Sequence, residues 1–154
     1  MIMWLPETPK KKFFKMFGQD TSLDNVEHDM IRKLFTEPRI HFAVVCASKG
    51  CPSLRNEAYV GKKLNEQLES GAKAFLSDSS RNRFDSATGK LMLSRIFDWY
   101  GDDFKKKDGT VQNFVALRMA KAPDEHAKIK AASLDWLDYD WSLNETAGEL
   151  SAKK

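Results

Sequence analysis

Apolar side chains recur with the period of an amphipathic helix in four stretches of the chain. The first stretch follows the capping candidates Thr21 and Ser22, and it ends before Pro38 because a proline disfavours helix in the residue before it. The last stretch stops at Pro123. The four predicted helices span about residues 23–35, 64–76, 96–104 and 111–122.

Three further stretches have the pattern of strands. Residues 40–47 are β-rich and almost continuously apolar, which predicts a central strand covered on both faces. Two short runs on either side of a Gly-containing turn predict a hairpin over about residues 83–93. Alternating apolar and polar positions predict a half-exposed late strand at about 134–143. Because helices and strands mix without a strict βαβ rhythm, the predicted fold class is α+β with a mixed sheet.

The composition is that of one globular domain. The chain has 154 residues, of which 42% are hydrophobic and 31% charged, so it is long and apolar enough to bury a core. No repeat or linker divides it, and residues 1–144 are therefore expected to form a single domain. The small and polar residues 145–154 are expected to form a flexible tail.

Charge and hydropathy argue against several classes of protein. The 25 basic and 22 acidic residues are interspersed, so the chain has no clustered basic face and no nucleic-acid partner is expected. The basic run Lys10–Lys12, set among phenylalanines, fits a surface hairpin or a weak membrane-facing patch. No stretch approaches the roughly 18 apolar residues of a transmembrane segment. The opening residues are too few for a secretory signal, so the chain as written is expected to be cytoplasmic.

Both cysteines fall in one short stretch, HFAVVCASKGCPSLRNEAY, residues 41–59. Their spacing matches no zinc or thioredoxin pattern, and no cofactor is expected. Cys51 lies between Gly50 and Pro52, as at the start of a helix, where backbone N–H groups lower the pKa of a thiol. Cys46, in the predicted strand, is expected to be an inert packed residue. A reactive Cys51, simple packing and a Cys46–Cys51 disulfide, which needs an oxidising compartment, all stay open.

His41 opens the same stretch. In a strand, His41 and Cys46 would lie about 16 Å apart and on opposite faces, so they are not expected to form a direct dyad. His41 is expected to be a hydrogen-bonded structural histidine. The same geometry argues against zinc bound by His28, His41, Cys46 and Cys51, and no metal site is predicted.

Glu27 points into the apolar stripe of the first predicted helix. An unpaired carboxylate there is costly, which predicts a cationic partner, with Arg95 or Arg55 as candidates. A structural ion pair is favoured over a catalytic carboxylate. His28 lies about 100° further round the helix, at the edge of the stripe, where its side chain could reach a cleft.

Four segments of the chain occur together in the order typical of one known family: SLDNVEHDMIR, EPRIHFAVVCASKGCPSLRNEAY, LSRIFDWYGDDF and YDWSLN. From about residue 20 to 144 the chain resembles the domain of unknown function 547 family, and the pattern H-F-A-x-x-C-x-S-x-x-C-P is the most specific part. The positions that fit the family motifs are Glu27, His28, His41, Cys46, Cys51, Pro52, Arg55, Tyr59 and Arg95.

The resemblance implies no assigned activity. The family occurs in bacterial proteins, which are often exported. In plant proteins it lies beside a leucine-zipper segment and looks like an interaction partner. Its pattern begins further upstream with an N-x-Y-N element that is missing here. The chain is therefore expected to be N-terminally truncated, and to be exported or periplasmic if an upstream segment is missing.

Two hypotheses of function remain. The first is a thiol-dependent hydrolase or acyl transferase acting on a small-molecule or peptide substrate. Its candidate residues are Cys51 or, second, Cys46 as nucleophile, His28 or His41 as base, Glu27 as orienting group, Arg55 or backbone amides for the oxyanion, and Arg55, Tyr59 and Arg95 for substrate binding. The second is a non-catalytic protein-interaction module with a recognition surface at the Cys–Arg loop and at Trp99–Tyr100.

Overall fold

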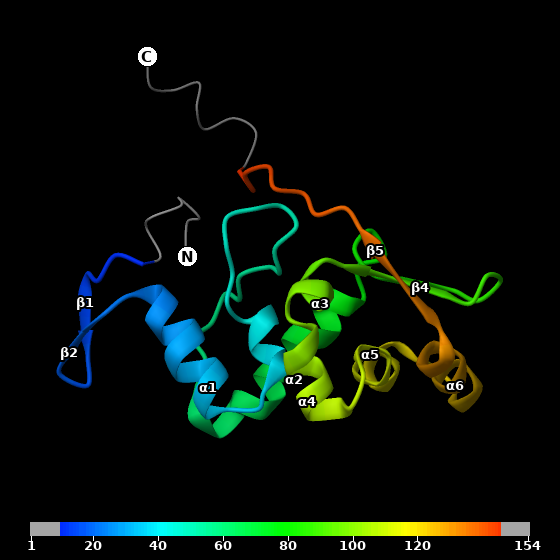
Figure 1. The fold of residues 1–154 in the computed structure, drawn as a ribbon, viewed down its shortest axis with the longest axis horizontal. Coiled ribbons are helices and arrows are strands. Elements are labelled where there is room, and N and C mark those ends of the chain that lie inside the picture. Colours follow the sequence, from blue (N-terminus) through cyan, green and yellow to red (C-terminus); the bar gives the residue numbers. More distant parts are fainter. Residues whose placement is uncertain (1–9, 146–154) are drawn as a thin grey trace, which may run out of the picture.

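Short helices and short strands make up residues 10–145, the part of the chain that the computed structural model describes (Figure 1). The predicted α+β class is confirmed. Most helices lie together in the lower part of Figure 1, with a small hairpin at one end and the larger sheet toward the other. The predictions for the opening residues, and for the tail beyond residue 145, lie outside the described residues.

The helical elements are short, and several are not regular α-helices. In chain order they are η1 (Asn25–Ile31, a π-helix), α1 (Arg32–Leu34), η2 (Pro38–Phe42, a 3₁₀-helix), η3 (Gly61–Lys63, also 3₁₀), α2 (Leu64–Leu76), α3 (Ile96–Trp99), α4 (Gly101–Asp108), α5 (Val111–Met119) and α6 (Pro123–Ala131). Local sequence sets their ends. Thr110 Oγ1 accepts a hydrogen bond from the backbone N–H of Asn113 at 3.0 Å at the start of α5. Gly109, with φ of 79°, ends α4.

Two small sheets are present in the described chain. Strands β1 (Phe14–Met16) and β2 (Gln19–Thr21) form an antiparallel hairpin next to the basic run, which is one of the two alternatives that the sequence left open there. The second sheet has the order β3 (Arg83–Asp85), β4 (Lys90–Ser94) and β5 (Ser133–Leu137). β3 and β4 form the predicted antiparallel hairpin, whereas β5 runs parallel to β4, so the sheet is mixed as predicted.

A cluster of phenylalanine rings forms the centre of the core. Phe97, Phe104 and Phe114 have no exposed side-chain surface, and the ring centroids of Phe104 lie 4.8 Å from Phe97 and 4.7 Å from Phe114. Phe42, at the end of η2, packs on the same cluster. Each buried ring contributes on the order of 1.5–3 kcal/mol. Since His41 precedes Phe42, the core fixes the backbone that carries this histidine.

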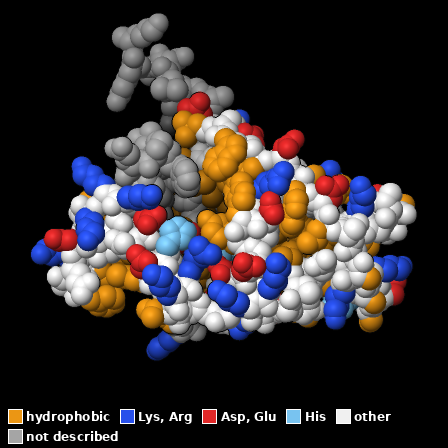
Figure 2. Space-filling view, viewed as in Figure 1, with side chains coloured by type: hydrophobic (Ala, Val, Ile, Leu, Met, Phe, Trp, Pro, Cys, Tyr) orange, Lys and Arg blue, Asp and Glu red, His pale blue; other side chains and the backbone are white. Residues whose placement is uncertain are grey.

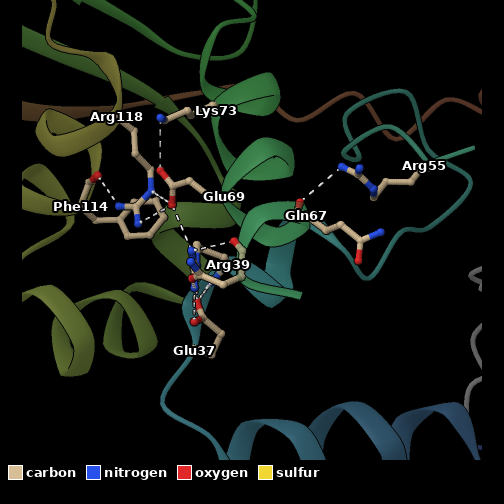
Figure 3. Close-up of polar contacts among 9 residues, drawn as sticks. Glu37, Arg39, Arg55, Gln67, Glu69, Lys73, Phe114 and Arg118 are labelled. Atoms are coloured by element: carbon tan, nitrogen blue, oxygen red, sulfur yellow. Dashed lines mark hydrogen bonds and ion pairs between the residues drawn. The ribbon is translucent and has the colours of Figure 1, made fainter. Parts of the chain in front are cut away.

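A network of ion pairs ties η2 to α2 and α5 (Figure 3). The Glu69 carboxylate on α2 lies 3.2 Å from Arg39 Nη1 and 3.1 Å from Arg118 Nη2. Arg39 also pairs with Glu37 at 2.6 Å, and the Arg118 guanidinium lies 3.8 Å from the centroid of the Phe114 ring. Both arginine side chains are only 12% exposed. The network therefore holds η2, and with it His41, against the helical layer.

The predicted central strand at 40–47 is wrong. Residues Pro38–Phe42 form a 3₁₀-helix, which Glu37 caps by accepting the backbone N–H of Arg39 at 3.2 Å, and turns follow it. A short apolar run fits a buried helical turn as well as a buried strand, and Pro38 at the first position favours the helical turn. Within this apolar run, Phe42 packs on the phenylalanine cluster.

The boundaries of other helices and strands also differ from those predicted from the hydrophobic pattern. The late strand ends at Leu137 and not near residue 143. The helix predicted over 96–104 is two helices that meet at Tyr100, and α6 is an additional helix that the pattern missed. In the first helix the π-turn widens the spacing of side chains, and Leu34 is 72% exposed, so the predicted apolar stripe is not a buried face.

Candidate functional site

A cleft of about 410 Å³ brings together segments that are far apart in the sequence. It is bordered by η1, by the loop after η2, by α3 and by the segment after β5. Its lining residues are Glu27, His41, Val44, Val45, Cys46, Cys51, Pro52, Ile96, Trp99, Tyr100, Tyr139 and Trp141. Four of the residues predicted to carry chemistry, namely Glu27, His41, Cys46 and Cys51, therefore share one cleft.

Backbone hydrogen bonds between the cysteine loop and the segment after β5 build this cleft. The N–H of Gly50 donates to the carbonyl of Asp140, and the N–H of Lys49 to that of Ser142, each at 2.9 Å. Ser48 forms an isolated antiparallel bridge with Leu143. Gly50 leaves room for the ring of Tyr139, because a Cβ at this position would lie 2.9 Å from that ring.

The two sulfur atoms lie in a polar pocket at the base of the cleft. The Cys46 Sγ lies 3.1 Å from the Ser48 hydroxyl and 3.7 Å from the Tyr139 hydroxyl, and these two hydroxyls are 2.9 Å apart. The backbone N–H of Cys46 donates to Cys51 Sγ at 2.8 Å. Both thiols are free. The two sulfurs therefore contact polar groups and are not sealed in hydrocarbon.

These contacts act on the two thiols in opposite directions. The adjoining Cys51 thiol, and after it the Ser48 hydroxyl, hold the pKa of Cys46 well below its usual value, although burial acts against them. Contact with Cys46 together with burial raises the pKa of Cys51. Cys46 is half-buried and opens to the cleft, while Cys51 is only 8% exposed. The arrangement provides one thiolate with a protonated thiol beside it.

The predicted helix start at Cys51 is wrong, because residues 52–60 form no helix and the next helical turn begins at Gly61. Without helix N–H groups around it, the Cys51 sulfur lacks the stabilisation that the sequence suggested. Cys46 was expected to be an inert packed residue, and the contacts described above give it the more acidic thiol instead.

His41 belongs to a separate polar group on the wall of the cleft. Its Nε2 lies 3.0 Å from Asp103 Oδ2, and the Nε of Arg32 donates to the same oxygen at 2.7 Å. The ring stacks on Tyr100 with a centroid distance of 3.9 Å. Burial lowers the pKa of His41 to about 4, although the Asp103 carboxylate acts in the opposite direction. The imidazole is therefore neutral at neutral pH and is held by a carboxylate, as predicted for a hydrogen-bonded histidine.

Asp103 keeps its negative charge in this group. Burial alone would raise the pKa of its carboxyl, but the hydrogen bonds from Arg32 and His41 hold it below the ordinary value. The strand argument against a His41–Cys46 pair no longer applies, since both residues line the same cleft. Within residues 10–145, however, no hydrogen bond joins a histidine nitrogen to either sulfur.

Glu27 faces the cleft from η1, and its side chain is 18% exposed. The predicted partners are wrong, because Arg95 pairs with Asp98 and Arg55 pairs with Glu57. Glu27 instead acts on Tyr100: burial first, and then the Glu27 carboxylate, raise the pKa of Tyr100 to about 12.

His28 lies behind Glu27, with its Nε2 4.0 Å from the Glu27 carboxylate and its Nδ1 3.1 Å from Arg32. It is not among the residues that line the cleft.

Three predicted substrate-binding residues lie elsewhere. Arg55 and Tyr59 belong to the loop before α2, where the Arg55 guanidinium lies 5.7 Å from the centroid of the Tyr59 ring. Arg55 Nη1 also donates to the Gln67 carbonyl at 3.3 Å (Figure 3). Arg55 lines a second pocket, which meets the cleft only at Pro52. Arg95 forms an exposed pair with Asp98. The structure therefore separates these three residues from the two sulfurs.

The sequence analysis missed two residues that line the cleft, Tyr139 and Trp141, and two that bond to residues of its lining, Ser48 and Asp103. The signal for them was present, since LSRIFDWYGDDF and YDWSLN were already recognised as family segments. Nothing in the local pattern, however, shows that these segments meet the cysteine loop. Among the described residues, no group of three or more His, Cys, Asp and Glu side chains could hold a metal ion, and no helix is long and apolar enough to cross a membrane.

The fold and cleft define an α+β domain with a paired-cysteine site. In a comparison with known families, residues 4–76, within the N-terminal half of the chain, match the model of the family described as "Protein of unknown function, DUF547". The resemblance inferred from the sequence is thereby confirmed over a range that includes both cysteines, His41 and Glu27. The segments around Tyr100 and Tyr139 lie beyond the matched range. No curated protein and no solved structure matches the chain.

Proposed function

We propose that this domain is a thiol-dependent acyl transferase or hydrolase in which Cys46 is the nucleophile. The observation that carries the proposal is the position of Cys46 Sγ at the base of a cleft, within 3.1 Å of the Ser48 hydroxyl and 3.7 Å of the Tyr139 hydroxyl. A lowered thiol pKa with access to a cleft is the usual condition of a catalytic cysteine. The matching family has no assigned activity and neither supports nor opposes this proposal.

In the proposed reaction the Cys46 thiolate attacks the carbonyl carbon of an ester, thioester or amide. The carbonyl electrons move to its oxygen, and the hydroxyls of Tyr139 and Ser48 are the donors available to that oxyanion. Collapse expels the leaving group, which takes up a proton from water, and leaves an acyl group on the sulfur. Water or an amine then attacks the thioester and regenerates the thiolate. His41, oriented by Asp103, is the candidate base that takes the proton from this second nucleophile.

Cysteine labelling tests the proposal. The rate of alkylation by iodoacetamide is followed against pH for the wild type, Cys46→Ser and Cys51→Ala. We expect rapid labelling of Cys46 well below the ordinary thiol pKa of about 8.5. Cys46→Ser should abolish it, and Cys51→Ala should shift the profile to higher pH because the adjoining thiol donor is lost.

Acylation provides the second readout. Incubation with p-nitrophenyl acetate should place an acetyl group on Cys46, detected by peptide mass spectrometry, and His41→Ala should slow its release more than its formation. The nucleophile assignment is overturned if Cys46 reacts no faster than a cysteine in the unfolded chain.

A protein-interaction module is the second candidate function. It is favoured by the exposure of large apolar side chains next to the cleft, where Trp99 is 47%, Trp141 58% and Leu143 53% exposed. Hydrophobic surface gathers where Figure 1 places the C-terminal segment, while charged side chains of both signs are scattered over the rest of the visible face (Figure 2). Slow, unfolding-dependent labelling of both cysteines would favour this candidate over the first.

A further inference from the structure

The charge and the rings of the cleft describe the group that it can accept. Its lining contains one carboxylate, from Glu27, and no lysine or arginine from the described residues. Four aromatic side chains also line it: Trp99, Tyr100, Tyr139 and Trp141. The face of an aromatic ring attracts cations, and a nearby carboxylate adds to this attraction. The cleft therefore combines negative charge with aromatic walls.

We infer that the cleft binds an alkylammonium group, such as a lysine side chain, presented next to the acyl group on which Cys46 acts. The inference deepens the function proposed above and rests on it for the reaction, but the binding step can be measured alone. The volume of about 410 Å³ is in the range of ligand-sized pockets, enough for a lysine side chain with its flanking peptide groups.

The aromatic wall is arranged as a cluster at the cleft. The ring centroid of Trp141 lies 4.6 Å from that of Tyr139 and 5.4 Å from that of Trp99. Trp99 and Trp141 are both about half exposed, so that their surfaces remain accessible to a ligand. Tyr100 plays a different part, because its ring already stacks on His41. We therefore assign the cation–π contact to the two tryptophans and Tyr139.

The nearest protein cation does not cancel the negative charge of the cleft. Arg32 lies 5.0 Å from the ring centroid of Tyr100, but its guanidinium is paired with Asp103 at 2.7 Å. His28 is 4.0 Å from Glu27 and lies outside the cleft lining. An anionic ligand would face the Glu27 carboxylate and the Cys46 thiolate without a positive partner. A neutral apolar ligand would cover the Glu27 carboxylate without adding a cationic partner to its contacts with Tyr100 and His28.

Two probes of similar shape distinguish the effect of charge on binding from the effect of apolar contact. Binding of Nα-acetyl-lysine methylamide and of Nα-acetyl-norleucine methylamide is measured by calorimetry on the wild-type chain. We expect the lysine probe to bind at least about tenfold more tightly. Equal affinities, or tighter binding of norleucine, would overturn the inference. This comparison needs no variant to fold.

Two pairs of variants then locate the contact. Glu27→Gln should remove most of the preference for lysine, whereas the control Glu66→Gln, on the exposed side of α2, should leave it intact. Trp99→Leu should weaken binding of the lysine probe about three- to tenfold, and the control Phe17→Leu, at the distant hairpin, should not change it. A preference that survives both Glu27→Gln and Trp99→Leu places the ammonium elsewhere and overturns the inference.

Cys46→Ser distinguishes this inference from the proposed function. If it still prefers lysine over norleucine, the ammonium site stands whether or not Cys46 proves to be a nucleophile. If Cys46 of the wild type labels rapidly and acylates but neither protein prefers lysine, the acyl-transfer proposal stands and the substrate class inferred here is wrong.

Discussion

The buried imidazole of His41 should make the protein less stable as the pH falls below neutrality. Its side chain is 3% exposed, and burial lowers its pKa from 6.5 to about 4 in the folded chain. Between these two values the unfolded chain takes up a proton that the folded chain does not. Stability is therefore unaffected by His41 above the unfolded pKa, and it is lost as the pH falls toward the folded one.

The size of the effect follows from the width of this window. Each pH unit in which only the unfolded state is protonated costs about 1.4 kcal/mol, so the whole window costs about 3 kcal/mol. For a domain with total stability of roughly 5–15 kcal/mol, this is a large fraction. Urea unfolding followed by circular dichroism, at a series of pH values from about 7 to about 4, measures it.

His41→Gln isolates this contribution. Glutamine keeps an N–H donor for Asp103 but does not titrate, so its free energy of unfolding should fall by about 3 kcal/mol less than that of the wild type over the same pH range. The common loss from carboxylates cancels in the difference. His126→Gln, on α6, is the matched control for removal of an imidazole elsewhere. If the wild type and His41→Gln lose stability in parallel, then His41 is not the buried neutral group described here.

Two further substitutions test the supports of the cleft. Gly50→Ala should lower the free energy of unfolding by about 1–3 kcal/mol and slow the alkylation of Cys46, because the new Cβ would push the ring of Tyr139 away from the sulfur. Gly61→Ala is the control, since a Cβ there has nothing within 4 Å. Equal unfolding midpoints for the two variants would refute the steric argument. Glu69→Gln should lower the free energy of unfolding by about 1–3 kcal/mol, since two nearly buried guanidinium groups lose their shared carboxylate, and chemical denaturation showing no loss would contradict it.

Local sequence patterns were sufficient to predict the elements that local interactions stabilise. The hairpin at β3 and β4 and the helix α2 lie where turn chemistry and helical periodicity place them. The segment from 40 to 47 failed because its apolar character reports burial and not the kind of secondary structure, and Pro38 decided for a helical turn. The π-turn at Glu27 could not be foreseen either, since a wider turn leaves no mark in a 100° periodicity.

Only part of the site could be predicted from the sequence, for a similar reason. Glu27, His41, Cys46 and Cys51 were selected by residue type and spacing, and they do line one cleft. Which cysteine is the more acidic depends on how the loop is folded, and the loop is held by hydrogen bonds to Asp140 and Ser142 from the other end of the chain. Such long-range contacts have no local pattern.

This dependence on a distant segment has a consequence for how the protein is made. Cys46 and Tyr139 are 93 positions apart, so the sulfur-bearing loop is synthesised long before the residues that surround it. Cys51 and Ser48, which lower the pKa of Cys46 most, lie in the loop itself. The loop, however, is held by hydrogen bonds from the N–H groups of Lys49 and Gly50 to the carbonyls of Ser142 and Asp140. The surroundings of the two sulfurs therefore form only after the segment that follows β5 has been synthesised and has paired with the loop.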